Sequence, residues 1–460
     1  MIVAGNPPYS VSSTNKGEWI ESLVADYKKN LNERNIQPLS DDYIKFIRYG
    51  QHFIEKNGSG ILAYVSNNSF LDGLIHRQMR KELLETFDKI YIIDLHGSVK
   101  RNEKTKDGSK DENVFDIQQG VSINIFVKKE SVKKDFLAQV FHFDLFGKRE
   151  FKYEQLSKNK LNSFNWNILK PEKSNYFFTE KDLSQSSSYI RGLSVIELFK
   201  VYNTGTETGR DSLFIDFEKE KLTENIQGVF PQERKQNLLQ EFNIVNTTSF
   251  KFLDRVNQSS FNSNNISKIF YRPFDERNVY YDQNLLRRPS FDAMSNLTNK
   301  NLCLITCRQQ SSFDFQHVFI SNTIVDRNSI SLQTKESAYG FPLYLYPDSD
   351  SQLSLDSTVS RTPNLDPKIV AEIAKGLGLT FESEKTDTEG SFAPIDLLDY
   401  IYAVLHSPSY RETYKEFLKI DFPRVPYPTD VEEFWRLVAL GGELRSLHLM
   451  ESASLSEYIT

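Results

Sequence analysis

The residues with the clearest chemical potential form the segment Asn6-Pro7-Pro8-Tyr9 near the start of the chain. The apolar residues before it predict a short buried strand, and two consecutive prolines end that strand because neither can donate a ladder hydrogen bond. Beyond the strand end, the Asn6 amide oxygen and the Pro7 carbonyl can point in the same direction, with Tyr9 next to them. The segment therefore offers two adjacent hydrogen-bond acceptors beside an aromatic ring.

This arrangement suits an exocyclic amine on a nucleobase. Such an amine is a weak nucleophile because its lone pair is conjugated with the ring. Two acceptors that bind both N–H groups favour a tetrahedral nitrogen, whose lone pair is then free to attack a methyl donor. The reacting base must first leave the duplex and needs an aromatic surface to stack on, a role that Tyr9 is placed to fill. The alternative interpretation is a structural Pro-Pro turn that closes a strand.

The segment resembles the [Asn/Asp/Ser]-Pro-Pro-[Tyr/Phe] signature of the amino-methyltransferases that act on DNA adenine. The resemblance implies that Asn6, Pro7, Pro8 and Tyr9 are catalytic residues. It also implies S-adenosyl-L-methionine as the cofactor and double-stranded DNA as the partner. Methylation of cytosine N4 poses the same chemical problem and stays an alternative, although Tyr9 favours adenine N6.

A second aromatic residue, Phe115, lies in the pattern Val-Phe-x-x-Gln-x-x-Val that leads into a predicted strand at residues 121–127. In the amino-methyltransferase family, the loop before the last strands carries an aromatic residue that packs on the other side of the flipped adenine. The resemblance gives Phe115 this role. Burial at a loop–strand junction is the alternative, because phenylalanine is usually buried whatever its function.

The elements around these residues alternate between strand and helix. Strands are predicted at residues 61–65 and 90–95, with a helix from residue 41 before the first and a helix over about 73–87 between the two. This order is typical of a parallel α/β sheet. In the family, a Gly-rich loop for the cofactor lies in the half of the sheet that precedes the Asn-Pro-Pro-Tyr segment. The later Gly clusters at residues 375–378 and 440–442 follow no predicted strand, so cofactor-binding residues stay unknown.

We therefore expect an α/β fold in which an incomplete Rossmann-like methyltransferase sheet precedes the rest of the chain. The chain resembles the carboxyl-terminal piece of a longer enzyme, without nuclease or translocase parts. We also expect that an upstream polypeptide could supply the cofactor-binding half, and that the open sheet would expose an edge and an apolar face.

Aromatic and arginine residues interleave between residues 269 and 281, and further arginines follow. These residue types read base edges and hold phosphates, whereas the alternative is a β-rich core with solvated arginines. The candidate DNA contacts are Arg272, Arg277, Arg287, Arg288, Arg308 and Gln309. Together with segments 399–411 and 421–426, this run resembles the specificity region of Type ISP restriction–modification enzymes and their Type IIG relatives.

The predicted domains follow from these segments. They are the carboxyl-terminal half of a methyltransferase domain (1–135), a connecting segment (136–183), a mixed α+β target-recognition region (184–347), a Ser/Asp-rich linker (348–366) and a helical carboxyl end (367–460). Two other functions compete with adenine methylation. One is a non-catalytic protein that recognises a DNA sequence, and the other is a degenerate fragment or unrelated α/β scaffold with a structural Pro-Pro turn.

Composition sets outer limits on function. The formal net charge of −6 lacks the strongly basic balance typical of DNA-binding proteins, although local patches decide phosphate contact. Cys303 and Cys307 are the only cysteines, so the sequence offers neither a disulfide framework nor a Cys-rich zinc site. We expect both to be thiols in the core and the protein to be cytoplasmic. The seven histidines are scattered along the sequence, so no metal site is predicted. The sequence shows neither a signal-peptide pattern nor an apolar run of membrane-spanning length.

Overall fold

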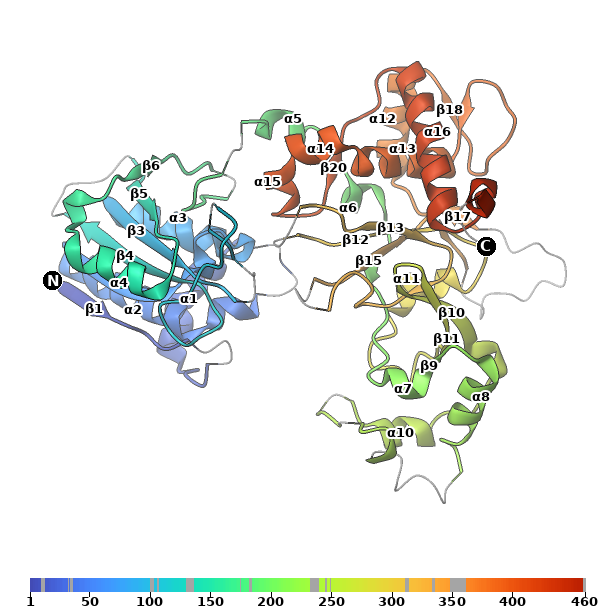
Figure 1. Ribbon diagram of the computed structural model, residues 1–460, viewed down its shortest axis with the longest axis horizontal. Helices are drawn as coiled ribbons and strands as arrows, with labels where there is room; N and C mark the ends of the chain where they lie inside the picture. The colour runs from blue at the N-terminus through green and yellow to red at the C-terminus, as the bar shows by residue number, and fades with distance from the viewer. Residues whose placement is uncertain are drawn as a thin grey trace. The chain divides into compact units, whose positions relative to one another are not determined.

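The computed structural model describes residues 1–460 except 10–12, 32, 34–35, 100–102, 106, 130–135, 174, 182–183, 232–239, 245, 249, 311–313, 333–335, 348–360 and 458–460. The chain divides into two compact units, unit 1 (residues 1–182) and unit 2 (residues 183–460), which are described separately (Figure 1). Each helix in the described part of the chain is too short or too polar to cross a membrane.

Unit 1 contains one six-stranded sheet with the order β1-β2-β4-β3-β5-β6 (Figure 1). Its strands are β1 (Ile2–Gly5), β2 (Gly60–Asn67), β3 (Lys89–His96), β4 (Val121–Lys128), β5 (Gln139–Asp144) and β6 (Asn167–Leu169). β1 pairs in parallel with β2, and β3 with β5, whereas β4 is antiparallel to both β2 and β3. The sheet is mixed because a loop, and not a crossover helix, connects β3 to its neighbour β4.

Two apolar clusters cover the two faces of this sheet. The alternation along β3 separates them, since Ile90 and Ile92 belong to one cluster and Ile93 and Leu95 to the other. The first cluster packs under the helices α1 (Glu18–Lys28), α2 (Asp42–Asn57) and α3 (Arg77–Thr86). The second lies under α4 (Arg149–Lys158) and the aromatic loop that leads to β6. Short 3₁₀ turns are η1 (Gln37–Ser40), η2 (Asn68–Phe70), η3 (Leu74–His76) and η4 (Leu161–Ser163).

Residues 136–183, which we expected to connect two domains, contribute β5, α4 and β6 to unit 1. Val140 of β5 is fully buried in the cluster that also holds Ile90 of β3. At the opposite edge, β1 pairs only with β2 among the described strands, and its Ile2 side chain is 75% exposed. β1 is thus an edge strand among the described residues, and the prediction of a buried strand here was wrong, because most of β1 is exposed. The expected exposed apolar face is not seen either, because an apolar cluster packs on each face of the sheet.

Unit 2 contains two four-stranded sheets, β14-β10-β11-β9 and β13-β12-β15-β8 (Figure 1). Their strands are β8 (Asn203–Thr204), β9 (Ile215–Asp216), β10 (Ile266–Arg272), β11 (Asp275–Tyr280), β12 (Cys303–Thr306), β13 (Val318–Ser321), β14 (Ile324–Val325) and β15 (Tyr339–Pro342). Two-stranded pairs are β7 (Leu193–Ser194) with β20 (Arg424–Val425), β16 (Tyr344–Leu345) with β17 (Thr362–Pro363), and β18 (Thr380–Phe381) with β19 (Ser391–Phe392). β12 lies between two cores, because Leu304 faces one apolar cluster and Cys303 and Ile305 face the other.

The helices of unit 2 gather mainly at the carboxyl end of the chain, as expected. They are α5 (Ser186–Ile190), α6 (Val195–Leu198), α7 (Asp211–Phe214), α8 (Lys219–Gln227), α10 (Phe252–Asn257), η6 (Ser263–Asn265), α11 (Phe291–Met294), η7 (Ser295–Leu297), α12 (Pro367–Leu377), α13 (Pro394–His406), α14 (Pro408–Thr413), α15 (Lys415–Leu418), α16 (Val431–His448) and η9 (Ala453–Glu457). α16 approaches α13 closely at Gly441, where an added Cβ would lie 1.9 Å from the Asp399 carbonyl oxygen. Of the predicted linker 348–366, residues 348–360 lie outside the described residues, and the β17 strand that follows pairs with β16.

Candidate functional site

Several polar residues of unit 1 gather where the carboxyl ends of the sheet strands meet. β1, β2, β3 and β5 run in the same direction, so their carboxyl ends meet there together with the amino end of β4. The segment Asn6–Tyr9 follows β1, Asn68 follows β2, His96 ends β3 and Asp144 ends β5. Parallel α/β sheets commonly bind ligands at the carboxyl ends of their strands, which makes this edge the candidate site.

Asn6 and Tyr9 lie side by side at the end of β1. The Tyr9 hydroxyl donates to the Asn6 Oδ1 atom at 3.3 Å and lies 3.5 Å from the Val65 carbonyl oxygen. Asn6 and Pro8 are exposed, Pro7 is buried, and the Tyr9 ring packs in part against the helix-covered cluster. Burial raises the pKa of Tyr9 to about 12, so the hydroxyl keeps its proton at neutral pH. Tyr9 therefore orients the Asn6 amide and holds its oxygen at the sheet edge.

A buried polar link joins the ends of β2, β3 and β4. The Asn68 side chain donates to Asp94 Oδ1 at 2.9 Å, and the Asn68 backbone N–H donates to the Gly120 carbonyl oxygen at 3.0 Å. An added Cβ at Gly120 would lie 2.6 Å from the Asn68 amide, so only glycine fits at this position. Both Asn68 and Asp94 are buried. The link fixes the start of β4 against the ends of its neighbours.

His96 lies in a ring of carboxylates at the end of β3. Its Nε2 atom is 2.7 Å from Asp144 Oδ1, and its Nδ1 atom is 3.8 Å from Asp94 and 3.7 Å from Glu103. The imidazole also stacks on Phe146 with a centroid distance of 3.8 Å. Burial alone would lower the pKa of His96, but the three carboxylates outweigh this effect and raise the pKa to about 10. His96 is therefore an imidazolium at neutral pH.

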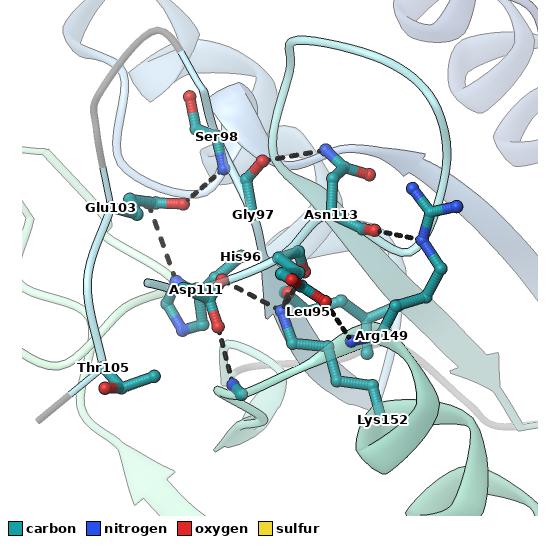
Figure 2. A network of polar contacts seen from close by, with 12 residues as sticks. Leu95, His96, Gly97, Ser98, Glu103, Thr105, Asp111, Asn113, Arg149 and Lys152 are labelled. Carbon is teal, nitrogen blue, oxygen red and sulfur yellow. Dashed lines mark hydrogen bonds and ion pairs between the residues drawn. The ribbon is translucent and has the colours of Figure 1, made fainter. Parts of the chain in front are cut away.

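The Phe115 loop, residues 97–120, connects β3 to β4 and is held by side chains from its own residues and from α4 (Figure 2). The Asn113 side chain donates to the carbonyl oxygens of Gly97 and Gln119 at 2.9 and 2.6 Å, and its Oδ1 atom accepts from the Phe115 N–H. Arg149 of α4 donates to the carbonyl oxygens of Asn113 and Phe115. Phe115 itself is partly buried against the second apolar cluster.

A fully buried ion pair anchors the same loop. The Lys152 ammonium lies 2.9 Å from Asp111 Oδ2, and both side chains are 0% exposed. Lys152 also donates to the carbonyl oxygens of Leu95 and Glu112, at 2.6 and 2.7 Å (Figure 2). Asp111 accepts from the Gly147 N–H at 2.7 Å through its other oxygen. Although the sequence of this loop shows no regular pattern, these contacts connect it to β3 and to α4.

The five arginines predicted to contact DNA lie at three separate positions in unit 2, and every one of these arginines forms an ion pair. Arg272 and Arg277 stack on the Tyr271 ring, at 3.9 and 4.1 Å from its centroid, and pair with Asp326 and Asp275 respectively. Asp326 is buried, and burial together with Asp211 raises its pKa to about 6 against the effect of Arg272. Both arginines are partly buried and are needed to balance these carboxylates.

Arg287 and Arg288 belong to a second place, the Glu207 cluster, which consists of Glu207, Arg287, Arg288 and Arg327. The distances from Glu207 carboxylate oxygens are 3.0 Å to Arg287, 3.8 Å to Arg288 and 2.7 Å to Arg327. The side chains of Arg287 and Arg288 are about half exposed, at 45% and 58%. Three guanidinium groups share one carboxylate, so the cluster carries a surplus of positive charge.

Arg308 and Gln309 occupy the third place, after β12. Arg308 is 2.9 Å from Asp421, and Gln309 is exposed. Arg327 is not among the predicted contacts, because its separation of 120 residues from Glu207 gives no local signal. Phe274 is not among them either, although its side chain is 69% exposed in the turn between β10 and β11, with a φ of 62°. A Pro-Phe-Asp sequence between two strand patterns could have indicated this turn.

Two family models match different parts of the chain. Residues 197–460 match the Type ISP C-terminal specificity domain, and residues 1–100 match the Eco57I restriction-modification methylase. None of the curated proteins matches the chain.

Three solved structures have a similar fold across 97% of this chain. They are the ATP-dependent Type ISP restriction-modification enzyme LlaBIII bound to DNA (24% identity, TM-score 0.74), the DrdV–DNA complex (22%, 0.72) and a nuclease-deletion mutant of the Type ISP enzyme LlaGI with a DNA substrate mimic (22%, 0.69). This chain spans 29%, 44% and 35% of their respective lengths. The α/β fold class and the resemblance to Type ISP enzymes are confirmed, and the chain belongs to the family of the Type ISP C-terminal specificity domain.

Proposed function

We propose that this chain is the methyltransferase and specificity module of a restriction–modification enzyme that methylates adenine N6 in duplex DNA. The observation that carries this proposal is the Asn6–Tyr9 segment at the carboxyl end of β1, with its amide oxygen directed by the Tyr9 hydroxyl. Asn6 Oδ1 and the Pro7 carbonyl would accept the two N–H groups of the target amine. When the nitrogen takes the methyl group and the methyl–sulfur bond of the cofactor breaks, releasing the thioether, the nitrogen would become positively charged. The two oxygens would favour that charge before a proton leaves to water.

The width of the sheet supports a role for Phe115 on the far side of the base. β1 and β4 are separated by β2 alone, so they lie roughly 10 Å apart, given two spacings of about 4.8 Å. An aromatic ring that stacks between two others needs ring-to-ring distances of roughly 9–14 Å in total. Tyr9 packs in part against the first apolar cluster, and Phe115, six residues before β4, packs against the second. We propose that the two rings contact opposite sides of a single flipped base at this end of the sheet.

S-adenosyl-L-methionine would supply the electrophilic methyl group. The described residues of unit 1 do not form a nucleotide loop for it. The chain's two Gly-x-Gly segments, 58–60 and 376–378, lie at the carboxyl ends of the helices α2 and α12 and do not follow strands. We therefore assign no residue to the cofactor. We propose that a further polypeptide segment carries this half and pairs with the open edge of β1.

Unit 2 would read the DNA sequence. The Glu207 cluster supplies phosphate contacts, because Arg287 and Arg288 are exposed and share one carboxylate. Gln309, which is exposed after β12, would contact base edges or phosphates. Arg272, Arg277 and Arg308 could contact DNA only by leaving or sharing their carboxylate partners.

The test has two measurements. Selection from a random duplex pool identifies the DNA sequence that the purified chain binds, and methylation-sensitive sequencing of a host that expresses the chain with a cofactor-half polypeptide reads the modified base. We expect N6-methyladenine within the selected sequence. Asn6→Ala should abolish the modification and leave DNA binding within about twofold. N4-methylcytosine at the site would contradict adenine specificity, and loss of binding by Asn6→Ala would contradict the assigned division of roles.

A second function is a DNA-recognition protein without catalysis. The absence of a strand-linked glycine loop from the described residues favours it. This function predicts sequence-specific binding with no base modified under any combination of partners. The same two measurements separate it from the first proposal.

A further inference from the structure

Three side chains with metal-ligand chemistry meet at one end of a sheet in unit 2. Cys307 follows the last residue of β12, His317 precedes β13, and Glu336 lies shortly before β15. Thr306 of β12 pairs with Val318 of β13 and with Tyr339 of β15, so these three strand ends are adjacent. Residues that are remote in sequence are thus brought together by the antiparallel pairing.

The distances between the three side chains are close to those of a tetrahedral site. His317 Nδ1 lies 3.0 Å from Glu336 Oε2 and 4.0 Å from Cys307 Sγ. The ligand atoms of all three lie within 4.8 Å of one another. With metal–ligand bonds of about 2.0–2.3 Å, two ligands of a tetrahedral zinc ion are roughly 3.3–3.6 Å apart. The two distances at His317 lie within about 0.5 Å of that spacing, and the third pair of atoms is no more than 4.8 Å apart.

The surroundings hold the site in place and bury two of its three side chains. Cys307 is 1% exposed and Glu336 is 9% exposed. The buried Gln310 side chain accepts from the backbone N–H groups of Gln316 and His317, at 2.9 and 3.2 Å, and so fixes the backbone that carries the imidazole.

We infer that Cys307, His317 and Glu336 form a binding site for one zinc ion. Thiolate and imidazole ligands favour Zn²⁺ over Mg²⁺ or Ca²⁺, and the carboxylate completes a charge-balanced set. Binding displaces the thiol proton, and a water molecule or a neighbouring group takes the fourth position. The ion would connect the ends of three strands just before Arg308 and Gln309. The site is separate from the Asn6–Tyr9 segment. Both cysteines are buried, as the sequence predicts, and the proposal gives Cys307 a role beyond packing.

Cobalt substitution of the full chain tests the site directly, because tetrahedral Co²⁺ bound by a thiolate has an intense visible spectrum and a thiolate charge-transfer band. Cys303 provides a matched control, since it is the other buried cysteine and belongs to β12 itself. We expect one Co²⁺ or Zn²⁺ per chain for the unchanged protein and for Cys303→Ser. Cys307→Ser should lose the charge-transfer band and bind at least about tenfold more weakly.

Further variants keep the test decisive if Cys307→Ser fails to fold. His317→Gln and Glu336→Gln should each weaken Co²⁺ binding by about tenfold or more while near-ultraviolet circular dichroism shows a folded unit. A chelator should lower the melting temperature of the unchanged chain and of Cys303→Ser but not that of His317→Gln. The inference is overturned if the unchanged chain shows no thiolate–Co²⁺ band, or if these substitutions leave metal content and affinity unchanged.

Discussion

Replacement of Asp111 by alanine should strongly destabilise unit 1. Lys152 and Asp111 are both 0% exposed, and the ammonium has the Asp111 carboxylate and two carbonyl oxygens as its partners within 2.9 Å. Asp111→Ala leaves that charge buried without its counter-ion, a change that costs about 3–5 kcal/mol. For a unit of this size, where 1 kcal/mol corresponds to about 2–4 °C, the melting temperature should fall by roughly 6–20 °C.

Urea unfolding followed by fluorescence measures this change. Unit 1 contains Trp19 and Trp166, so a Trp435→Phe background removes the tryptophan signal of unit 2. Lys158→Ala is the matched control, because Lys158 lies on the same helix in an exposed pair with Glu154. This pair is 67% and 52% exposed, and its loss should cost less than about 1 kcal/mol.

Amide hydrogen exchange locates the effect. In Asp111→Ala, the amides of the Phe115 loop at residues 107–120 should exchange faster than in the Lys158→Ala control, because the loop loses its connection to β3 and α4. Equal unfolding free energies for the two variants would show that the buried pair does not hold the loop. The account of how Phe115 is positioned would then be wrong.

Three other predictions concern charged groups. Arg272→Ala leaves the buried Asp326 carboxylate without its guanidinium and should lower the unfolding free energy by on the order of 3 kcal/mol in urea unfolding. Arg287→Ala and Arg288→Ala should each change the free energy of unfolding by less than about 0.5 kcal/mol. Each should reduce the magnitude of the slope of log K against log salt concentration by about 1, where K is the association constant for DNA. Unchanged slopes would exclude phosphate contact. The pKa of His96 is about 10 in the folded chain, against an ordinary value of 6.5. The protonated His96 therefore stabilises the folded state fully below about pH 6.5, progressively less between pH 6.5 and 10, and not at all above pH 10. Urea unfolding between about pH 6 and 10.5 should show this decline, and parallel curves for the unchanged chain and His96→Gln would refute it.

Local patterns predicted the elements that depend on local chemistry. α13 spans Pro394–His406 within the predicted helical carboxyl end, because a proline opens it and Ser407-Pro408 begin the next helix. β4 spans Val121–Lys128, close to the strand predicted at residues 121–127. The predicted parallel sheet was correct for the pairs β1–β2 and β3–β5 but wrong for β4, whose antiparallel placement depends on its pairing with both β2 and β3 and not on its own residues.

The contacts of the candidate functional residues also fall into two groups, those between residues close in sequence and those between residues that only the fold brings together. The proximity of Asn6 and Tyr9 follows from a separation of three residues across a turn. The partners that hold the Phe115 loop are remote, since Lys152 is 41 residues from Asp111. Arg308 and Asp421 are 113 residues apart. Residue type alone identified the arginines, but only the fold shows which carboxylate each one meets.

These carboxylate partners determine which arginines are available to a DNA phosphate. Arg272, Arg277 and Arg308 each have an aspartate within 2.9 Å, so a phosphate must compete with an existing ion pair. In the Glu207 cluster, one carboxylate serves three guanidinium groups and a net charge of about +2 remains. A phosphate that binds there gains attraction without first breaking a pair, since Glu207 can stay with Arg327. The Glu207 cluster should therefore contribute more to the salt dependence of DNA binding than the arginine stack on Tyr271, although both contain the same residue type. This local surplus of positive charge makes the proposed DNA binding compatible with a formal net charge of −6 for the whole chain.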